Sequence, residues 1–241
     1  MSYIGTTEIG KMFLGDVEID KAYLGSTLVF SGETSGGGEL SDYVQSGLVL
    51  HMDGKTGKTG TSSWESVVGN VVFTNNGATF NADHIYFDGV DDCLTNTSFS
   101  GPTSGSGTIE VVYDSELYGS SSTLIFASKT NNGLSFGINA SKYIIFTIGS
   151  TTRVRPISTL SKASTSVSTA RQLQNGVQMS TTSNSNWTGR DSTNHIGRRS
   201  SGNYFKGKIY SIRIYSRQLS SDEVLKNLAV DNIRFELGLT L

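Results

Sequence analysis

From residue 43 onward, short segments in which hydrophobic and polar residues alternate are separated by clusters of Gly, Ser, Asn and Asp. Alternation with a period of two is typical of strands that bury one face, and such clusters are typical of turns. We therefore predict an all-β fold, an antiparallel sandwich of two sheets. The clearest strands are expected at 48–52, 84–87, 108–113, 124–127, 134–138, 143–148 and 208–215.

One helix is expected near the C-terminus. Ser220 and Glu223 have the spacing of a capping box, in which each side chain accepts a hydrogen bond from the other residue's backbone amide. Val224, Leu225 and Leu228 follow at helical spacing. The pattern predicts a short helix that begins after Ser220.

The first thirty residues repeat with a period of ten, as Tyr3-Ile4-Gly5, Phe13-Leu14-Gly15 and Tyr23-Leu24-Gly25. Gly permits the positive φ of a tight turn, so we expect a small three-stranded meander. So short a segment buries little surface and needs a partner, namely the downstream domain, sister copies or a docking site. A plain β-extension of the main domain is the alternative. The expected anchor or oligomerisation residues are Tyr3, Ile9, Phe13, Leu14, Ile19, Tyr23 and Leu24.

The composition around residue 35 divides the chain. Residues 31–39 consist only of Gly, Ser, Thr and Glu, which is typical of a flexible linker. We therefore expect a β-repeat anchor at 1–32, a linker at 33–42 and the sandwich at 43–241.

The overall composition excludes several classes of protein. Of 241 residues, 28 are Gly and 36 are Ser, yet 36% are hydrophobic and 10% aromatic, which is enough for a core. A net charge of −2 does not provide the excess of positive charge that nucleic-acid binding needs. No apolar run reaches the roughly 18 residues of a membrane-spanning helix. The single Cys93 excludes an intramolecular disulfide, and the first residues show no secretory signal.

Several motifs, in this order, are similar to the laminin-G-like branch of concanavalin A-like domains. They are Leu48 to Gly54, Trp64-Glu65-Ser66, Tyr86-Phe87-Asp88-Gly89-Val90-Asp91-Asp92, Asn194-His195-Ile196-Gly197-Arg198, the strand at 205–215 and the closing helix from Arg217. The resemblance covers residues 43–235 and implies a jelly-roll sandwich in which Trp64 is buried. Residues 158–169 depart from it, because low-complexity sequence stands where relatives carry a central strand with an aromatic residue.

The N-terminal repeat has its own resemblance. It is similar to short leader segments on structural proteins of tailed phages that infect gut Bacteroidetes. This implies a segment that attaches the chain to a virus particle.

Catalysis is not expected. Hydrolases of this fold carry Glu-x-Asp-x-x-Glu on one strand, whereas residues 18–20 are followed by Tyr23 at the last Glu position and lie in the repeat. Glu110 is interpreted as a surface carboxylate on a strand, with an acid/base role as the alternative. Cys93 is expected to be a buried apolar residue. Residues 53–60 resemble a phosphate loop but lack its first Gly and its helix, so they are expected to form a hairpin loop.

Asp88, Asp91 and Asp92 are the candidate metal ligands. Hard carboxylate oxygens suit Ca²⁺, and many laminin-G-like domains bind calcium at a loop rim. The same residues also suit a structural corner, in which Asp side chains accept hydrogen bonds from nearby amides. Both interpretations remain open from the sequence.

Carbohydrate sites combine an aromatic platform with planar polar side chains on loops. Trp187 lies among Asn and Thr residues and is one candidate. Arg198, Arg199, Asn203 and Tyr204 form a second candidate loop.

Laminin-G-like domains ordinarily work outside cells, and virion proteins released by lysis need no signal peptide. We therefore expect a phage virion protein, a head fibre or a capsid or tail decoration, that binds host-surface or mucosal glycans. The expected partners are its own copies as a homotrimer, other virion proteins and glycans, without nucleic acid or membrane insertion. A decoration that binds no sugar, and a bacterial surface lectin or glycoside hydrolase, are the alternatives.

Overall fold

The computed structural model describes in full residues 38–101, 106–116, 123–128, 134–139, 141, 143–147, 161–168, 171–179, 193–199 and 202–241. It describes the backbone alone for residues 2–4, 7–9, 12–14, 17–19, 21–24, 27–31, 148, 151–156 and 180–181.

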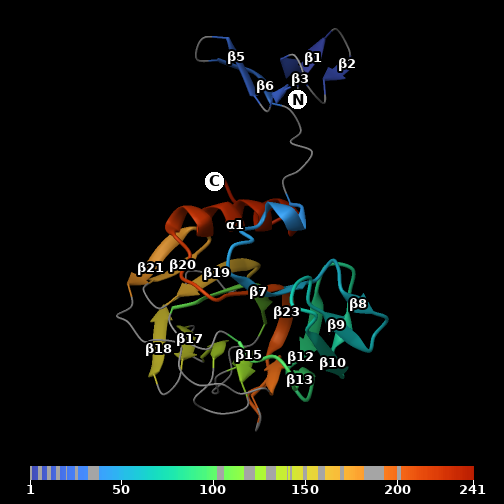
Figure 1. Ribbon diagram of the computed structural model, residues 1–241, viewed down its shortest axis with the longest axis vertical. Helices are drawn as coiled ribbons and strands as arrows, with labels where there is room; N and C mark the ends of the chain where they lie inside the picture. Colours follow the sequence, from blue (N-terminus) through green and yellow to red (C-terminus); the bar gives the residue numbers. More distant parts are fainter. Residues whose placement is uncertain are drawn as a thin grey trace.

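Two antiparallel sheets make up the sandwich, as predicted (Figure 1). The nine-stranded sheet has the order β18 (Thr151–Pro156), β17 (Tyr143–Ile148), β16 (Ser135–Ile138), β15 (Thr123–Ser128), β22 (Asn194–Ile196), β13 (Cys93–Asn96), β10 (Val72–Asn76), β9 (Ser63–Glu65) and β8 (Lys58–Thr59). The second sheet has the order β11 (Thr79–Phe80), β12 (Ile85–Asp88), β23 (Lys206–Tyr215), β14 (Thr108–Ser115), β19 (Ala163–Ser168), β20 (Arg171–Gln174) and β21 (Val177–Thr181), and β7 (Leu48–Asp53) also pairs with β23.

The alternation of the sequence determines which side chains fill the space between the sheets. On β14, Ile109, Val111 and Tyr113 belong to the main hydrophobic core, whereas Glu110 and Val112 do not. The expected burial of Trp64 and Cys93 is confirmed, at 0% and 1% exposure.

The low-complexity segment does contain a central strand. β19 pairs with β14 through Thr108↔Ser168 to Tyr113↔Ala163, and all six of its residues are buried. Its side chains are small, so that α1 (Ser221–Arg234) packs against it. Because Ser and Ala have no marked strand propensity, the sequence pattern alone left this strand uncertain.

α1 lies across the outer face of the second sheet (Figure 1). The capping box is confirmed: Glu223 N donates to Ser220 Oγ at 3.2 Å, and Ser220 N donates to Glu223 Oε2 at 2.8 Å. The short 3₁₀ helix η1 (Leu40–Asp42) precedes the first strand of the sandwich.

The N-terminal repeat differs from the expected meander. It forms three separate two-stranded hairpins, β1 (Ser2–Ile4) with β2 (Thr7–Ile9), β3 (Met12–Leu14) with β4 (Val17–Ile19), and β5 (Lys21–Leu24) with β6 (Thr27–Ser31). The pairs Ile4↔Thr7, Leu14↔Val17 and Leu24↔Thr27 leave two residues between the strands of each hairpin. A two-residue connection that starts with Gly favours a hairpin, which is why each repeat closes on itself.

Candidate functional site

Two loops that were predicted separately to bind calcium and sugar lie side by side. β12 pairs with β23 so that Asp88 is opposite Lys206. A Cβ added at Gly89 would lie 2.8 Å from Lys206 Cβ, and one at Gly197 would lie 3.3 Å from the Asp92 carbonyl oxygen. We call residues 88–92, 197–199 and 202–205 the rim. In Figure 1 the start of β23 (orange) lies at the lower end of the sandwich, away from α1.

The three aspartates of the rim are brought together as predicted, with ligand atoms all within 4.8 Å of one another. Asp92 Oδ2 accepts from Asp88 N at 2.8 Å, and Asp88 Oδ1 accepts from Val90 N at 2.8 Å. These bonds confirm the structural corner. Burial raises the pKa of Asp92, and the neighbouring Asp88 and Asp91 carboxylates raise it further. The calcium site stays a prediction.

The predicted sugar-binding loop forms a tight turn. Arg199 N donates to Gly202 O at 2.9 Å and Gly202 N donates back to Arg199 O at 3.3 Å. Asn203 is exposed and has a φ of +59°, an uncommon conformation for a residue other than Gly. Arg198 Nη1 donates to Tyr204 Oη at 3.5 Å, the limit of a hydrogen bond. The structure therefore brings these four predicted residues together, whereas Trp187 lies outside the described residues.

The two arginines of the rim have unused donors. Arg198 Nε and Arg199 Nε are buried, and neither has an acceptor in the described part of the chain. The ion pairs of the described residues do not join either guanidinium to Asp88, Asp91 or Asp92. An orphaned buried donor in a folded protein calls for an explanation, and a ligand is one.

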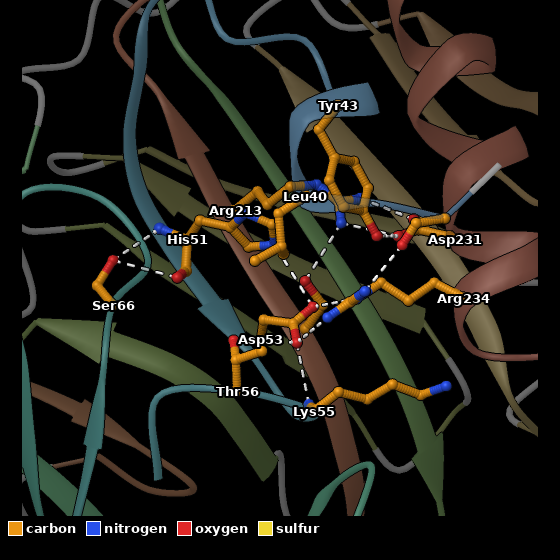
Figure 2. Close-up of polar contacts among 12 residues, drawn as sticks. Leu40, Tyr43, His51, Asp53, Lys55, Thr56, Ser66, Arg213, Asp231 and Arg234 are labelled. Carbon is orange, nitrogen blue, oxygen red and sulfur yellow. Dashed lines mark hydrogen bonds and ion pairs between the residues drawn. The ribbon is translucent and has the colours of Figure 1, made fainter. Parts of the chain in front are cut away.

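A second polar cluster is buried between the sheet and α1. We call Tyr43, Glu110, Arg213, Asn227 and Asp231 the clasp. Arg213 on β23 binds both oxygens of Asp231 on α1 at 2.7 Å (Figure 2). Its Nε donates to Glu110 Oε2 at 3.1 Å. Tyr43 Oη donates to Asp231 Oδ1 at 2.9 Å, and Asn227 Nδ2 donates to Glu110 Oε2 at 2.7 Å.

The clasp is closed to solvent. Glu110 is 2% exposed, and Arg213 and Asp231 are 0% exposed. Burial raises the pKa of Glu110, and the Arg213 guanidinium opposes that shift. The prediction that Glu110 is a surface carboxylate is wrong, because β14 turns this side chain toward α1. Its Oε2 accepts hydrogen bonds both from Arg213 on the sheet and from Asn227 on α1, and thereby links the helix to the sheet.

Beside the clasp, a further set of contacts joins α1 to β7 and to Gly38 in the linker. Arg234 Nε and Nη2 donate to the two oxygens of Asp53 at 2.7 and 2.8 Å, and Arg234 Nη1 donates to Gly38 O at 2.8 Å. His51 Nε2 is buried without a hydrogen bond among the described residues and lies 3.9 Å from Asp53 Oδ2. Burial and the neighbouring Arg213 lower the pKa of His51 to about 3.

The sequence profile of the concanavalin A-like lectin/glucanases superfamily matches residues 93–225, more than half of the chain. The chain belongs to this superfamily. No curated protein matches the sequence.

Solved structures share the fold of this superfamily member at low sequence identity. A Trypanosoma rangeli sialidase has a TM-score of 0.61 and 15% identity, covering 78% of this chain and 33% of the sialidase. A structure of botulinum neurotoxin type C, whose cell entry depends on two ganglioside molecules, has a TM-score of 0.56 and 14% identity, covering 76% of this chain and 51% of the toxin chain. The serotype D/C binding domain matches with a TM-score of 0.56, 14% identity and coverage of 76% and 52%. The chain thus spans about a third of the sialidases, and these likenesses show the fold alone.

One contact of this superfamily domain had no recognisable sequence signal. The hairpin expected at residues 53–60 is not formed there: residues 54–57 cross from β7 in one sheet to β8 in the other, and β8 forms its hairpin with β9 instead. The Lys58 ammonium donates to the carbonyls of Gly54 and Asn81, and to that of Ala82 at 3.0 Å. A lysine in a Gly- and Thr-rich loop predicts a solvated side chain, but here it joins two loops.

Proposed function

We propose that this chain is a virion protein whose sandwich binds glycans through the rim. The observation that carries the proposal is that the loop at residues 88–92 lies next to the loop at 197–205, at one end of a lectin-type sandwich. The second loop places the exposed Asn203 near Arg198, Arg199 and Tyr204 in the sequence. Planar amide and guanidinium groups beside an aromatic ring are the side chains with which proteins recognise sugar hydroxyls. The ganglioside bound by the type C neurotoxin supports a sugar ligand for this fold.

The direction of the rim supports display on a particle. Gly38, the first described residue of the linker, is bonded to Arg234 at the end of α1, and α1 lies at the opposite end from the start of β23 in Figure 1. A domain tethered through Gly38 therefore presents its rim outward. Among the described residues, no helix is long and apolar enough to cross a membrane.

The N-terminal repeat, residues 1–32, would serve as the anchor. Tyr3 lies on β1, Ile9 on β2, Phe13 and Leu14 on β3, Ile19 on β4, and Tyr23 and Leu24 on β5. An isolated two-stranded hairpin is marginal in water, so three of them need a further surface to pack on. We propose that this surface comes from sister chains in a homotrimer and from a capsid or tail protein.

A glycan array tests the ligand half of the proposal. Full-length protein is expected to bind a subset of glycans, and the double variant R198A/R199A is expected to lose that binding. The matched control is Lys226→Ala, which removes an exposed charge from α1, outside the rim. An array without hits would refute glycan binding and favour a purely structural decoration.

Deletion of residues 1–32 tests the anchor half. Sedimentation analysis is expected to show a trimer for the full chain and a monomer for the deletion, and the deletion is expected to be absent from virions. A monomeric full chain, or a deletion that still attaches to particles, would refute the anchor. Release of reducing sugar by the full chain would instead favour a glycoside hydrolase.

A further inference from the structure

The chemical class of the ligand is indicated by the side chain of Arg199. It is half-buried, and no hydrogen bond or ion pair of its guanidinium occurs in the described part of the chain. Its Nε is buried, whereas its terminal nitrogens are not among the buried atoms that lack a partner. In the described part of the chain these terminal nitrogens have no acceptor, so their donors are available to a ligand. A guanidinium with a free edge is the group that best matches a carboxylate, which it binds through two parallel hydrogen bonds.

The turn that carries Arg199 is accessible and held in place. A Cβ added at Gly202 would have no atom within 4 Å, so there is open space beside this residue. Its base is fixed because Leu124 N donates to Asn203 O at 3.1 Å and Phe205 N donates to Gly197 O at 2.7 Å. The uncommon backbone of Asn203 is maintained by this frame, and such conformations cluster at ligand sites. The exposed Asn203 amide lies next to the turn and is free to meet neutral hydroxyls.

The charges of the rim limit how much negative charge the ligand carries. Asp88, Asp91 and Asp92 lie together on the adjacent loop, where the Asp92 carbonyl oxygen is next to Gly197, the residue before Arg198. Three carboxylates repel a densely charged chain such as a sulfated polysaccharide, because like charges at close range disfavour binding. A sugar with one carboxylate avoids that repulsion when the carboxylate sits on Arg199 and the uncharged part extends over the rest of the rim.

We infer that the rim binds a glycan through a single carboxylate-bearing sugar, with Arg199 as the carboxylate partner and Arg198 in support. The inference rests on the proposed glycan-binding function and adds the ligand class. Sialic acids and uronic acids share this chemistry.

Calorimetry with defined probes distinguishes the possibilities. The probes are sialyllactose, a glucuronic acid disaccharide, lactose as the neutral counterpart, and a heparin hexasaccharide. Full-length protein is expected to bind one of the two carboxylated probes at least about 10-fold more tightly than lactose or heparin. Arg199→Ala is expected to remove that preference. Arg199→Lys is expected to keep part of it, because lysine has the positive charge but lacks the planar guanidinium that donates two parallel hydrogen bonds. Lys226→Ala, on the exposed face of α1, is expected to bind as the parent does.

Each other result has a defined meaning. Tightest binding to heparin, or lactose binding that equals the carboxylated probes and is unchanged in Arg199→Ala, would overturn the carboxylate inference while glycan binding stands. Failure of all four probes in calorimetry, with hits on the array, would overturn the inference as well. Failure in both would overturn the proposed function itself. Thermal melting of each variant checks the fold, and Arg199→Lys provides a second readout if Arg199→Ala unfolds.

Discussion

Replacement of Arg213 by Met measures how much the clasp stabilises the fold. The variant removes four hydrogen bonds, one to Glu110, one to Ser211 and two to Asp231, together with the stacking of the guanidinium 4.2 Å over the Tyr43 ring. It leaves two carboxylates buried without their counter-charge. Breaking a buried pair from one side costs about 3–5 kcal/mol.

In a domain of this size that cost lowers the melting temperature by about 10 °C. Urea unfolding monitored by circular dichroism gives the free energy directly. The matched control is Arg217→Met, because Arg217 pairs with Glu223 but is 33% exposed, and exposed pairs contribute at most about 1 kcal/mol. The triple variant R213M/E110Q/D231N, in which the clasp holds no charge, is expected to recover part of the loss. A loss below about 1 kcal/mol in Arg213→Met, or a triple variant less stable than Arg213→Met, would refute this reasoning.

Three further predictions concern the other polar groups. His51 stays neutral in the folded protein, with a pKa lowered to about 3, and accepts a proton near pH 6.5 when unfolded, so stability should fall as the pH drops from 6.5 toward 3. Urea midpoints should therefore depend less on pH between 6.5 and 5 in His51→Phe than in the parent, and equal slopes would contradict this. Lys58→Met leaves the Gly54, Asn81 and Ala82 carbonyls without their donor and should lower the free energy of unfolding by about 1–3 kcal/mol. Replacement of the exposed Lys55 by Met should change it little, and equal melting temperatures for the two variants would contradict this role of Lys58. If the rim aspartates hold calcium, added Ca²⁺ should raise the melting temperature and Asp91→Asn should abolish the rise; a curve unchanged by both Ca²⁺ and a chelator would reject the calcium prediction.

The fold was predictable because its strands follow simple alternation. All seven strands expected from the pattern lie within two residues of observed strands, and the capping box located α1. The pattern did not predict strands in which hydrophobic and polar residues fail to alternate clearly. One such strand is β19, which contains only Ala, Ser, Thr and Val. Its burial depends on neighbours far away in the sequence, which periodicity does not report.

The candidate site was predictable only in pieces. The turn-rich sequence identified the aspartates and Arg198–Tyr204 as loops, but their adjacency depends on the pairing of β12 with β23. The clasp gave one signal that sequence reasoning missed. Arg213 is the single charged residue of the second part of β23, residues 209–215, and a charge among buried apolar residues requires a buried partner. The partner, Asp231, is on a helix 18 residues away.

The strand β23 has a mechanical consequence. Its first residue adjoins the rim, and its Arg213 is bonded to α1, whose Arg234 holds Gly38. A pull between a ligand on the rim and the linker would therefore be carried along β23. Because β14, β7 and β12 flank this strand with antiparallel ladders, the load would be shared by many backbone hydrogen bonds at once instead of opening them one after another. The ladder geometry would therefore make the domain resist tension applied between its rim and its linker.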